Sequence, residues 1–322
     1  SRCACIGTRH LALGFLGSRS TPAISMVPLV ASSSCGPPAH GSLNVRGIQP
    51  RPEFAPYVMD VVAHKDGVSS AIASTKMWDR RKTALLADEL PLMHARLGHK
   101  PVLLDIGANQ GWFTLLAAAT GHARVIAVEA SNSNAARLER SLCLNGANFT
   151  KHVKLHKVGV GATTAECTLV ARRSNIASPA VVCGQVDPAA FMNQWGAPRG
   201  FKDYVVTGTM HQTRIDDLVN SRVDVLKIDV EGHELEVAKG WSALFDRAPP
   251  RLVLTEYVPS LIAKTSNTTE PSEYLKFFLR RGYTIEADGG HILATEAHLV
   301  GWSRATRRRW MSDLVIRSAV GV

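Results

Sequence analysis

A strand of the buried type, followed at once by a glycine-rich turn, sets the strongest limit on the fold of this chain. Residues 102–111 read V-L-L-D-I-G-A-N-Q-G, so an apolar run carries Asp105 at its end and turns between Gly107 and Gly111. Glycine has no Cβ, so such a turn lets the backbone come very close to a neighbour or a ligand. Residues 111–120 are almost entirely apolar and predict a buried helix directly after the turn.

Alternating strand and helix patterns continue along most of the chain. Further strands are predicted at 124–129, 152–160, 223–230, 252–257, 283–286 and 313–316, and further helices at 79–97, 131–144, 235–239 and 272–281. This order predicts a doubly wound, mostly parallel sheet. Two regions depart from it. Residues 57–63 and 71–74 are predicted as two strands joined by a turn, and residues 161–212 as an irregular segment with one or two strands.

The first 52 residues differ in composition from the rest. They contain five arginines and no Lys, Asp or Glu, and they are rich in Ser, Gly, Pro and Ala. This composition resembles an organelle transit peptide, whereas the apolar patch at 11–16 would suit a signal peptide. We expect a disordered or targeting segment over 1–52 and one folded domain over 53–322. The expected location is organellar or secretory if the segment is an address, and otherwise cytoplasmic.

Charge, hydropathy and cysteine content narrow the class of protein. The formal charge of +10 suits an anionic ligand without requiring nucleic acid, and the basic run at 304–309 reads as a solvated loop. No run of 18 apolar residues is present, so no transmembrane helix is expected. The six cysteines, at 3, 5, 35, 143, 167 and 183, have neither C-x-x-C nor zinc-site spacing, so we expect reduced thiols and no metal site.

The ligand expected at the glycine turn is a nucleoside without a diphosphate. A dinucleotide site would need G-x-G-x-x-G, and G-A-N-Q-G lacks the middle glycine that admits a pyrophosphate. The next strand ends on Glu129, whose carboxylate can accept hydrogen bonds from both hydroxyls of a ribose. S-adenosylmethionine fits this description, and its sulfonium and amino groups suit a nearby acid such as Asp105.

Four sequence blocks together resemble the FkbM-type S-adenosylmethionine-dependent methyltransferases. They are V-L-L-D-I-G-A-N-Q-G-W-F-T at 102–114, V-I-A-V-E-A at 125–130, T-R-I-D-D-L at 213–218 and L-K-I-D-V-E-G-H-E-L-E-V-A-K-G at 226–240. The resemblance implies a Rossmann-like class I methyltransferase, with a seven-stranded, mostly parallel sheet and helices on both faces. It implies S-adenosylmethionine as cofactor, held by Asp105, Gly107, Ala108, Asn109, Gly111, Glu129 and Ala130.

The fourth block carries the candidate catalytic residues. Alternation places Lys227, Asp229 and Glu231 on one side of an extended segment. One interpretation is a structural pair of Lys227 with Asp229 or Glu231, because buried charges are costly unless paired. The other places Asp229 beside the transferred methyl, with Glu231 or His233 as the base. Glu256 ends the next strand and either contacts the substrate or holds Lys227.

The resemblance implies O-methylation of a sugar or another small-molecule hydroxyl, so the expected partner is such a substrate and no nucleic acid. An RNA methyltransferase is the alternative suggested by the basic charge, but no N-P-P-Y tetrapeptide or interleaved basic and aromatic patch is present. A non-catalytic binding protein with this fold is the third hypothesis. The dipeptide Trp78-Asp79 either covers the cofactor or belongs to the core.

Overall fold

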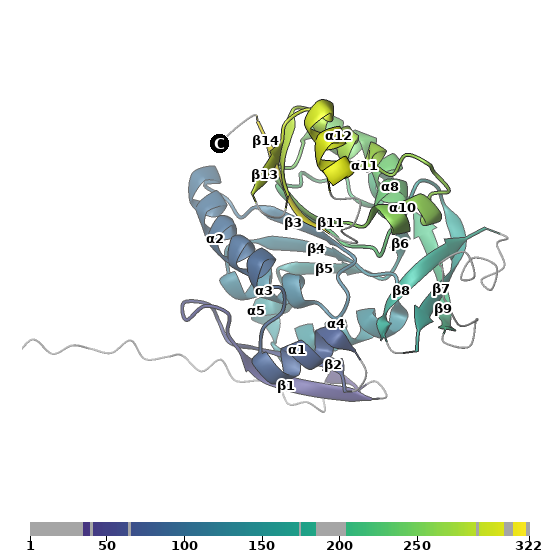
Figure 1. Cartoon of the computed structure of the whole chain (residues 1–322). Helices are drawn as coiled ribbons and strands as arrows, with labels where there is room; N and C mark the ends of the chain where they lie inside the picture. Colours follow the sequence, from purple (N-terminus) through teal and green to yellow (C-terminus); the bar gives the residue numbers. More distant parts are fainter. Residues whose placement is uncertain are drawn as a thin grey trace, which may run out of the picture.

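The folded part of the chain is a layered α/β structure (Figure 1). A computed structural model describes residues 35–38, 41–63, 66–173, 175–184, 204–287, 290–305 and 312–319. Its main sheet has eight strands in the order β13-β12-β14-β11-β10-β3-β4-β5. These strands are β3 (Val102–Ile106), β4 (Arg124–Val128), β5 (Val153–His156), β10 (Val225–Ile228), β11 (Leu252–Tyr257), β12 (Tyr283–Ala287), β13 (His291–Leu293) and β14 (Ser312–Ser318).

The predicted mostly parallel sheet is confirmed, with one strand more than expected. Strands β5, β4, β3, β10 and β11 run parallel to one another, and β14 lies antiparallel between β11 and β12. The eighth strand is β13, which forms a hairpin with β12 at the edge of the sheet. The expected count of seven missed it because a strand of three residues is too short to show a period in the sequence.

Alternate residues of the central strands face two separate hydrophobic cores. Leu103, Val125 and Val225 pack into one core, whereas their neighbours Leu104 and Leu226 pack into the other. This follows from the two-residue period of a strand, and it requires helices on both faces. One face is covered by α2 (Arg80–Leu97) and α3 (Trp112–Thr120), and the other by α8 (Glu234–Lys239), α9 (Ser242–Arg247), α11 (Glu273–Leu279) and α12 (Glu296–Ala305).

The remaining described helices are short, except α4 beside β2. They are α1 (Gly67–Thr75), α4 (Asn132–Leu144), α5 (Ala147–Thr150), α7 (Ile215–Leu218) and α10 (Pro259–Thr265). The prediction of a strand at 71–74 was wrong, because Asp66 accepts a hydrogen bond from the Ser69 amide and begins α1 there. Asp and Ser favour helix starts for this reason. Helix α2 continues through Pro91, where an interruption was expected.

A second sheet stands beside the main one and forms a wall of the site described below. It has the order β6-β9-β7-β8, from β6 (Gly159–Val160), β7 (Ala165–Arg172), β8 (Asn175–Cys183) and β9 (Tyr204–Thr213). The region 161–212 therefore holds three long strands among its described residues, not one or two. The strand predicted at 152–160 is divided, with β5 in the main sheet and β6 in the second.

The N-terminal hairpin extends the fold beyond the expected boundary at residue 53. β1 (Ser42–Ile48) pairs antiparallel with β2 (Tyr57–Val62), and Val45 and Ile48 are buried in a core. The outer edge of β2 is covered by side chains. Asn145, Ser141 and Gln110 accept hydrogen bonds from the amides of residues 58, 60 and 62, respectively. Residues 1–34 lie outside the described part of the chain.

Two disulfides replace the reduced thiols that the sequence led us to expect. Cys35 is bonded to Cys143 and Cys167 to Cys183, with Cα atoms 5.6 and 4.1 Å apart. Cys167 lies directly opposite Cys183 in the pairing of β7 with β8. The tertiary structure brings each pair together, and no local sequence spacing signals it.

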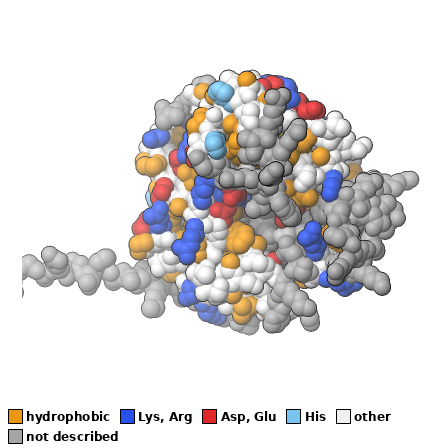
Figure 2. Space-filling model, viewed as in Figure 1, with side chains coloured by type: hydrophobic (Ala, Val, Ile, Leu, Met, Phe, Trp, Pro, Cys, Tyr) orange, Lys and Arg blue, Asp and Glu red, His pale blue; other side chains and the backbone are white. Residues whose placement is uncertain are grey.

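No helix among the described residues is both long and apolar enough to cross a bilayer. The Lys and Arg side chains of described residues are scattered over the face shown in Figure 2. Arg307, Arg308 and Arg309 of the basic run lie outside the described residues.

Candidate active site

A cavity of about 370 Å³ opens at the carboxyl ends of β3, β4, β10 and β11. In an open, mostly parallel sheet this is where ligands bind. The glycine turn and Glu129 line one part of it, and three acids, Asp229, Glu231 and Glu256, line another. Residues of α1 and of the second sheet complete its walls, among them Ile72, Leu169, Ser178, Val181 and Met210.

The glycines of the turn are required by neighbouring protein atoms. Gly107 has φ +72°, and a Cβ there would lie 1.9 Å from the carbonyl oxygen of Asp229. Gly111 has φ +96°, and a Cβ there would lie 2.3 Å from Leu138 Cδ1. Gly107, Ala108 and Asn109 line the cavity, whereas Gly111 does not. A cofactor contact at Gly111 therefore stays a prediction, and in this structure the glycine lets the turn pack closely against Leu138 of α4.

Glu129 is held in place by the backbone around it. Its two carboxylate oxygens accept hydrogen bonds from the amides of Asn109, at 2.7 Å, and Ser131, at 2.8 Å. Burial raises the pKa of this carboxyl, and the two amides oppose that shift by stabilising the charged form. A carboxylate has about four acceptor positions, so the side chain keeps acceptor capacity toward the cavity that it and Ala130 line.

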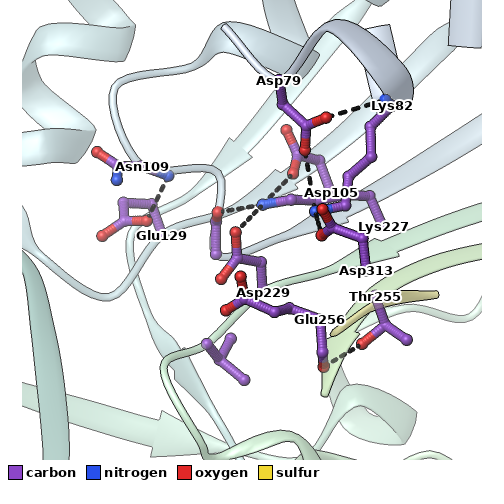
Figure 3. Close-up of polar contacts among 12 residues, drawn as sticks. Asp79, Lys82, Asp105, Asn109, Glu129, Lys227, Asp229, Thr255, Glu256 and Asp313 are labelled. Atoms are coloured by element: carbon purple, nitrogen blue, oxygen red, sulfur yellow. Dashed lines mark hydrogen bonds and ion pairs between the residues drawn. The ribbon is translucent and has the colours of Figure 1, made fainter. Parts of the chain in front are cut away.

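Asp105 lies beneath the cavity, where it holds Lys227. It is fully buried, and it accepts a hydrogen bond from the Thr114 hydroxyl at 2.6 Å. Lys227 Nζ lies 3.4 Å from Asp105, donates to the Gly107 carbonyl at 2.7 Å, and lies 3.9 Å from Asp229 (Figure 3). The prediction that Asp105 contacts the cofactor directly does not fit this position. Instead it orients the lysine that supports the glycine turn.

Three carboxyl groups face the cavity beyond Lys227. The Asp229 side chain is 35% exposed, and it sits between the turn and the other two acids. Burial first, and the charge of Asp229 second, raise the pKa of both Glu231 and Glu256 to about 8. Glu231 also receives a hydrogen bond from Ser178 of β8. Both glutamates therefore have a pKa near neutral pH, which is the range in which a general acid or base works.

Backbone conformation singles out Glu231 as well. It has φ +54°, in the left-handed region that a residue with a side chain adopts only at a cost. The following residue, Gly232, also has a positive φ and packs against Leu261. Glu231 combines this unfavourable backbone conformation with a side chain that lines the cavity, which singles it out as a candidate functional residue.

His233 lines the cavity and is anchored by Gln212. Gln212 donates its Nε2 hydrogen to the Thr163 carbonyl, so its Oε1 accepts from His233 Nε2 at 2.9 Å. Nε2 is therefore assigned the proton, and burial lowers the pKa of His233 to about 4. Of the two bases considered from the sequence, Glu231 has the pKa closer to neutral pH. Gln212 and Ser178 had no sequence signal, because strands far along the chain bring them to the site.

Trp78 lines the cavity and also packs against a hydrophobic core, whereas Asp79 does not line the cavity. Met59, Val68 and Ile72 from the N-terminal hairpin and α1 line it too. Their apolar side chains gave no reason to distinguish them from core residues. Over the described residues, no group of three or more His, Cys, Asp or Glu side chains is arranged to hold a metal ion.

Both the sequence and the structure are similar to those of known proteins. A family model described as Methyltransferase FkbM domain matches residues 105–285. No curated protein matches the sequence. Among solved structures, a methyltransferase FkbM from Methylobacillus flagellatus is 18% identical with a TM-score of 0.40, and the match covers 67% of this chain and 43% of that protein. This chain thus aligns with less than half of that protein's length.

Two other solved structures show a similar degree of likeness. An O-methyltransferase from Bacillus cereus in complex with SAH is 13% identical with a TM-score of 0.37, covering 77% of this chain and 86% of that one. A putative RNA methyltransferase from Pyrococcus horikoshii is 13% identical with a TM-score of 0.33, covering 74% and 86%.

Proposed function

The chain belongs to the FkbM methyltransferase domain family, and on this premise we propose that it transfers a methyl group from S-adenosylmethionine to a hydroxyl of a sugar or another small molecule. The observation that carries the proposal is Glu129. Two backbone amides fix its carboxylate at the cavity wall, beside the glycine turn. A fixed acceptor of this kind suits the paired hydroxyls of a ribose.

The residues present fit the proposed cofactor. Glu129 would hold the ribose, and the backbone of Ala108 and Asn109 would meet the methionine part, because both line the cavity next to it. Ala130, with Asn134 and Val158, would surround the adenine. The three carboxyl groups beyond Lys227 suit a ligand that carries positive charge, and opposite charges near each other favour the ionised carboxylates.

The acids are placed for proton transfer from the acceptor. When bound, S-adenosylmethionine supplies an electrophilic methyl group, and the electron pair of its carbon–sulfur bond remains on sulfur. The acceptor oxygen forms the new bond to carbon while its proton passes to an ionised carboxyl of the Glu231–Glu256 pair. Asp229, beside the turn, accepts a hydrogen bond that aligns the acceptor. Alignment contributes most in a displacement that disperses charge.

The charge of the site favours a small neutral acceptor over RNA. Asp229, Glu231 and Glu256 line the part of the cavity where the acceptor would bind, and they would repel phosphate groups. On the face shown in Figure 2, the described Lys and Arg side chains are scattered and form no continuous track for a nucleic acid backbone.

Calorimetric titration with S-adenosylmethionine tests the cofactor assignment. Glu129→Gln should weaken binding roughly 10- to 100-fold, because it removes charge-assisted hydrogen bonds to the ribose. Glu139→Gln is the matched control, since Glu139 lies on the surface of α4 and pairs with Lys157; its affinity should equal that of the wild type. Equal affinities for all three proteins would refute the ribose site, and a wild type without affinity would refute the function.

Asp229→Asn tests where the chemistry occurs. An amide presents a donor where the carboxylate accepts, so we expect turnover to fall roughly 100-fold. Cofactor affinity should fall much less than turnover, because Glu129 and the turn are untouched and only one of the three carboxyl groups loses its charge. Transfer of label from the methyl donor into acceptors from a cell extract measures turnover and identifies the product. Undiminished transfer would remove Asp229 from the mechanism.

A further inference from the structure

A buried ion cluster outside the matched family region reaches the acid-lined part of the cavity. It consists of Asp79 and Lys82 at the start of α2 and Asp313 in β14, whereas the family model covers 105–285. Lys82 Nζ lies 2.9 Å from Asp79 Oδ2 and also contacts Asp313 Oδ1. The Lys82 side chain is only 8% exposed, so its charge is poorly solvated and depends on these partners.

Asp79 is shaped to hold Lys82 in this position. Its Oδ1 accepts a hydrogen bond from the Lys82 amide at 3.0 Å, which begins α2, while Oδ2 pairs with the Lys82 ammonium. Asp79 has φ +35°, a left-handed conformation that is unfavourable for a residue with a side chain. The preceding residue, Trp78, lines the cavity. Asp79 thus connects Trp78 of the cavity wall, its neighbour in sequence, to the ion cluster.

Strand register places Glu256 next to this cluster. In the antiparallel pairing of β11 with β14, Glu256 lies directly opposite Asp313. Like charges at directly opposite positions destabilise a sheet. Lys82 contacts Asp313 from the helix side, as Figure 3 shows, and so offsets that repulsion. Glu256 itself lines the cavity.

The other charged groups around Glu256 are accounted for. Asp229 and Glu231, which follow β10, and Asp313 all disfavour its ionisation, whereas Lys82 favours it. Lys227 is engaged by Asp105 and the Gly107 carbonyl. Arg81, next to Lys82, donates to Glu286 and to the backbone carbonyl of Asp313.

We propose that Lys82 is a positioning residue for the proton transfer: by pairing with Asp79 and Asp313 behind Glu256, it offsets part of their negative charge and so favours release of a proton from the Glu231–Glu256 pair. The inference rests on the proposed function for its catalytic meaning. The proton state itself is a property of the protein alone. Burial and Asp229 already raise the pKa of Glu256 to about 8, and the loss of Lys82 would raise it further.

Carbon-13 NMR of the ligand-free protein, labelled at the glutamate carboxyl carbon, measures this directly. The Glu256 signal is assigned by its loss in Glu256→Gln. In Lys82→Met the titration midpoint of Glu256 should move up by about one pH unit, whereas Lys82→Arg should restore it. The control Arg81→Met removes the same charge from an exposed pair one residue away and should leave the midpoint unchanged.

A second variant keeps the proposal testable if Lys82→Met does not fold. Asp313→Asn removes the like charge opposite Glu256, so the midpoint should move down. If neither variant moves the midpoint, the proposal is overturned.

In active enzyme the rising limb of kcat/KM against pH should follow the NMR midpoint. For Lys82→Met this means about tenfold lower kcat/KM at pH 7, with recovery at higher pH. A midpoint that moves in a protein without methyl transfer would refute the proposed function and leave the electrostatic role of Lys82 standing. If the NMR midpoint of Glu256 moves in Lys82→Met but kcat/KM still rises at the pH of the wild type, the catalytic part of the proposal is overturned.

Discussion

Two buried lysines form ion pairs with different acids around this site. Lys227 supports the glycine turn through the Gly107 carbonyl and is held by Asp105. Lys82 stands behind Glu256 and is held by Asp79 and Asp313. Three carboxyl groups and one ammonium group therefore line the cavity, with Lys227 lying 3.9 Å from Asp229. A cationic donor is the ligand that this excess of acids favours.

His233 predicts a pH dependence of stability. Its pKa falls from 6.5 to about 4 on folding because burial favours the neutral ring. The stabilisation is therefore fully present above pH 6.5 and is lost as the pH falls toward 4, because the unfolded chain takes up the proton first. Between pH 7 and 4.5, the unfolding free energy of the wild type should fall by on the order of 2 kcal/mol more than that of His233→Gln.

Urea unfolding at the two pH values measures this difference. His99→Gln, at an exposed histidine, serves as the control and should behave like the wild type. Parallel losses in the wild type and in His233→Gln would show that His233 is not buried as a neutral ring.

At the residue scale, the sequence predicted the acids better than their roles. Glu129, Asp229, Glu231 and Glu256 all line one cavity, as their places at strand ends suggested. Asp105 does not, because the side chain of a residue inside a strand points to one face of the sheet and here meets Thr114 and Lys227. That direction depends on the packing of both faces, which the local pattern of residues does not contain.

At the scale of elements, the edge of β2 that faces away from β1 is hydrogen-bonded by side chains and not by another strand. Asn145 accepts from the Val58 amide at 2.9 Å and donates to its carbonyl at 2.8 Å, while Ser141 and Gln110 serve the amides of Asp60 and Val62. Gln110 belongs to the glycine turn itself. The hydrogen bond from the Val62 amide to Gln110 therefore connects the β1–β2 hairpin, which lines the cavity, to the glycine turn, which lines it too.

Asn145→Ala should destabilise the protein by about 2–4 kcal/mol. It leaves two buried backbone groups of Val58 without partners, and each such group costs about 1–3 kcal/mol. Chemical denaturation followed by circular dichroism measures the change. Asn148→Ala, at an exposed position of α5, should stay within about 0.5 kcal/mol of the wild type. A similarly small effect at Asn145 would contradict the role given to it at the edge of β2.

Prediction of elements succeeded where hydrophobic period and length agreed. Strands β3, β4, β10 and β11 are short apolar runs between helices, and they were identified with boundaries within a few residues. The strand at 71–74 was predicted from four residues and is helical, because the cap at Asp66 decides that segment. Strands β7 and β8 form a hairpin, whereas β9 pairs with β7 across a long interval of sequence, so this partner could not be inferred from local pattern.

At the scale of the whole molecule, the N-terminal part of the chain is joined to the domain in two ways. β1 buries Val45 and Ile48 in a core, and Cys35 is bonded to Cys143 of α4. Disulfides persist where thiols are oxidised. We propose that this chain matures in such a compartment, which favours the secretory interpretation of its first residues over the cytoplasmic one.

Truncation separates the expected boundary from the observed one. Deleting residues 1–34 leaves every described residue in place, so the melting temperature should stay close to that of the full chain. Deleting residues 1–52 removes β1 and Cys35 and should cost roughly 5 kcal/mol or more, since the disulfide closes a loop of about 108 residues.

Calorimetry of the two deletions and of full-length Cys35→Ser separates the strand from the disulfide. If the two deletions melt alike, β1 contributes nothing to the domain.

The contact between Lys82 and Asp313 has a consequence for synthesis. Lys82 belongs to α2 and Asp313 to β14, so the two can meet only after the last described strand has been synthesised. A nascent chain that has folded only as far as β11 would hold Glu256 without Asp313 opposite it. Because β14 also separates β11 from β12, completion of the sheet and completion of the proton site are one event.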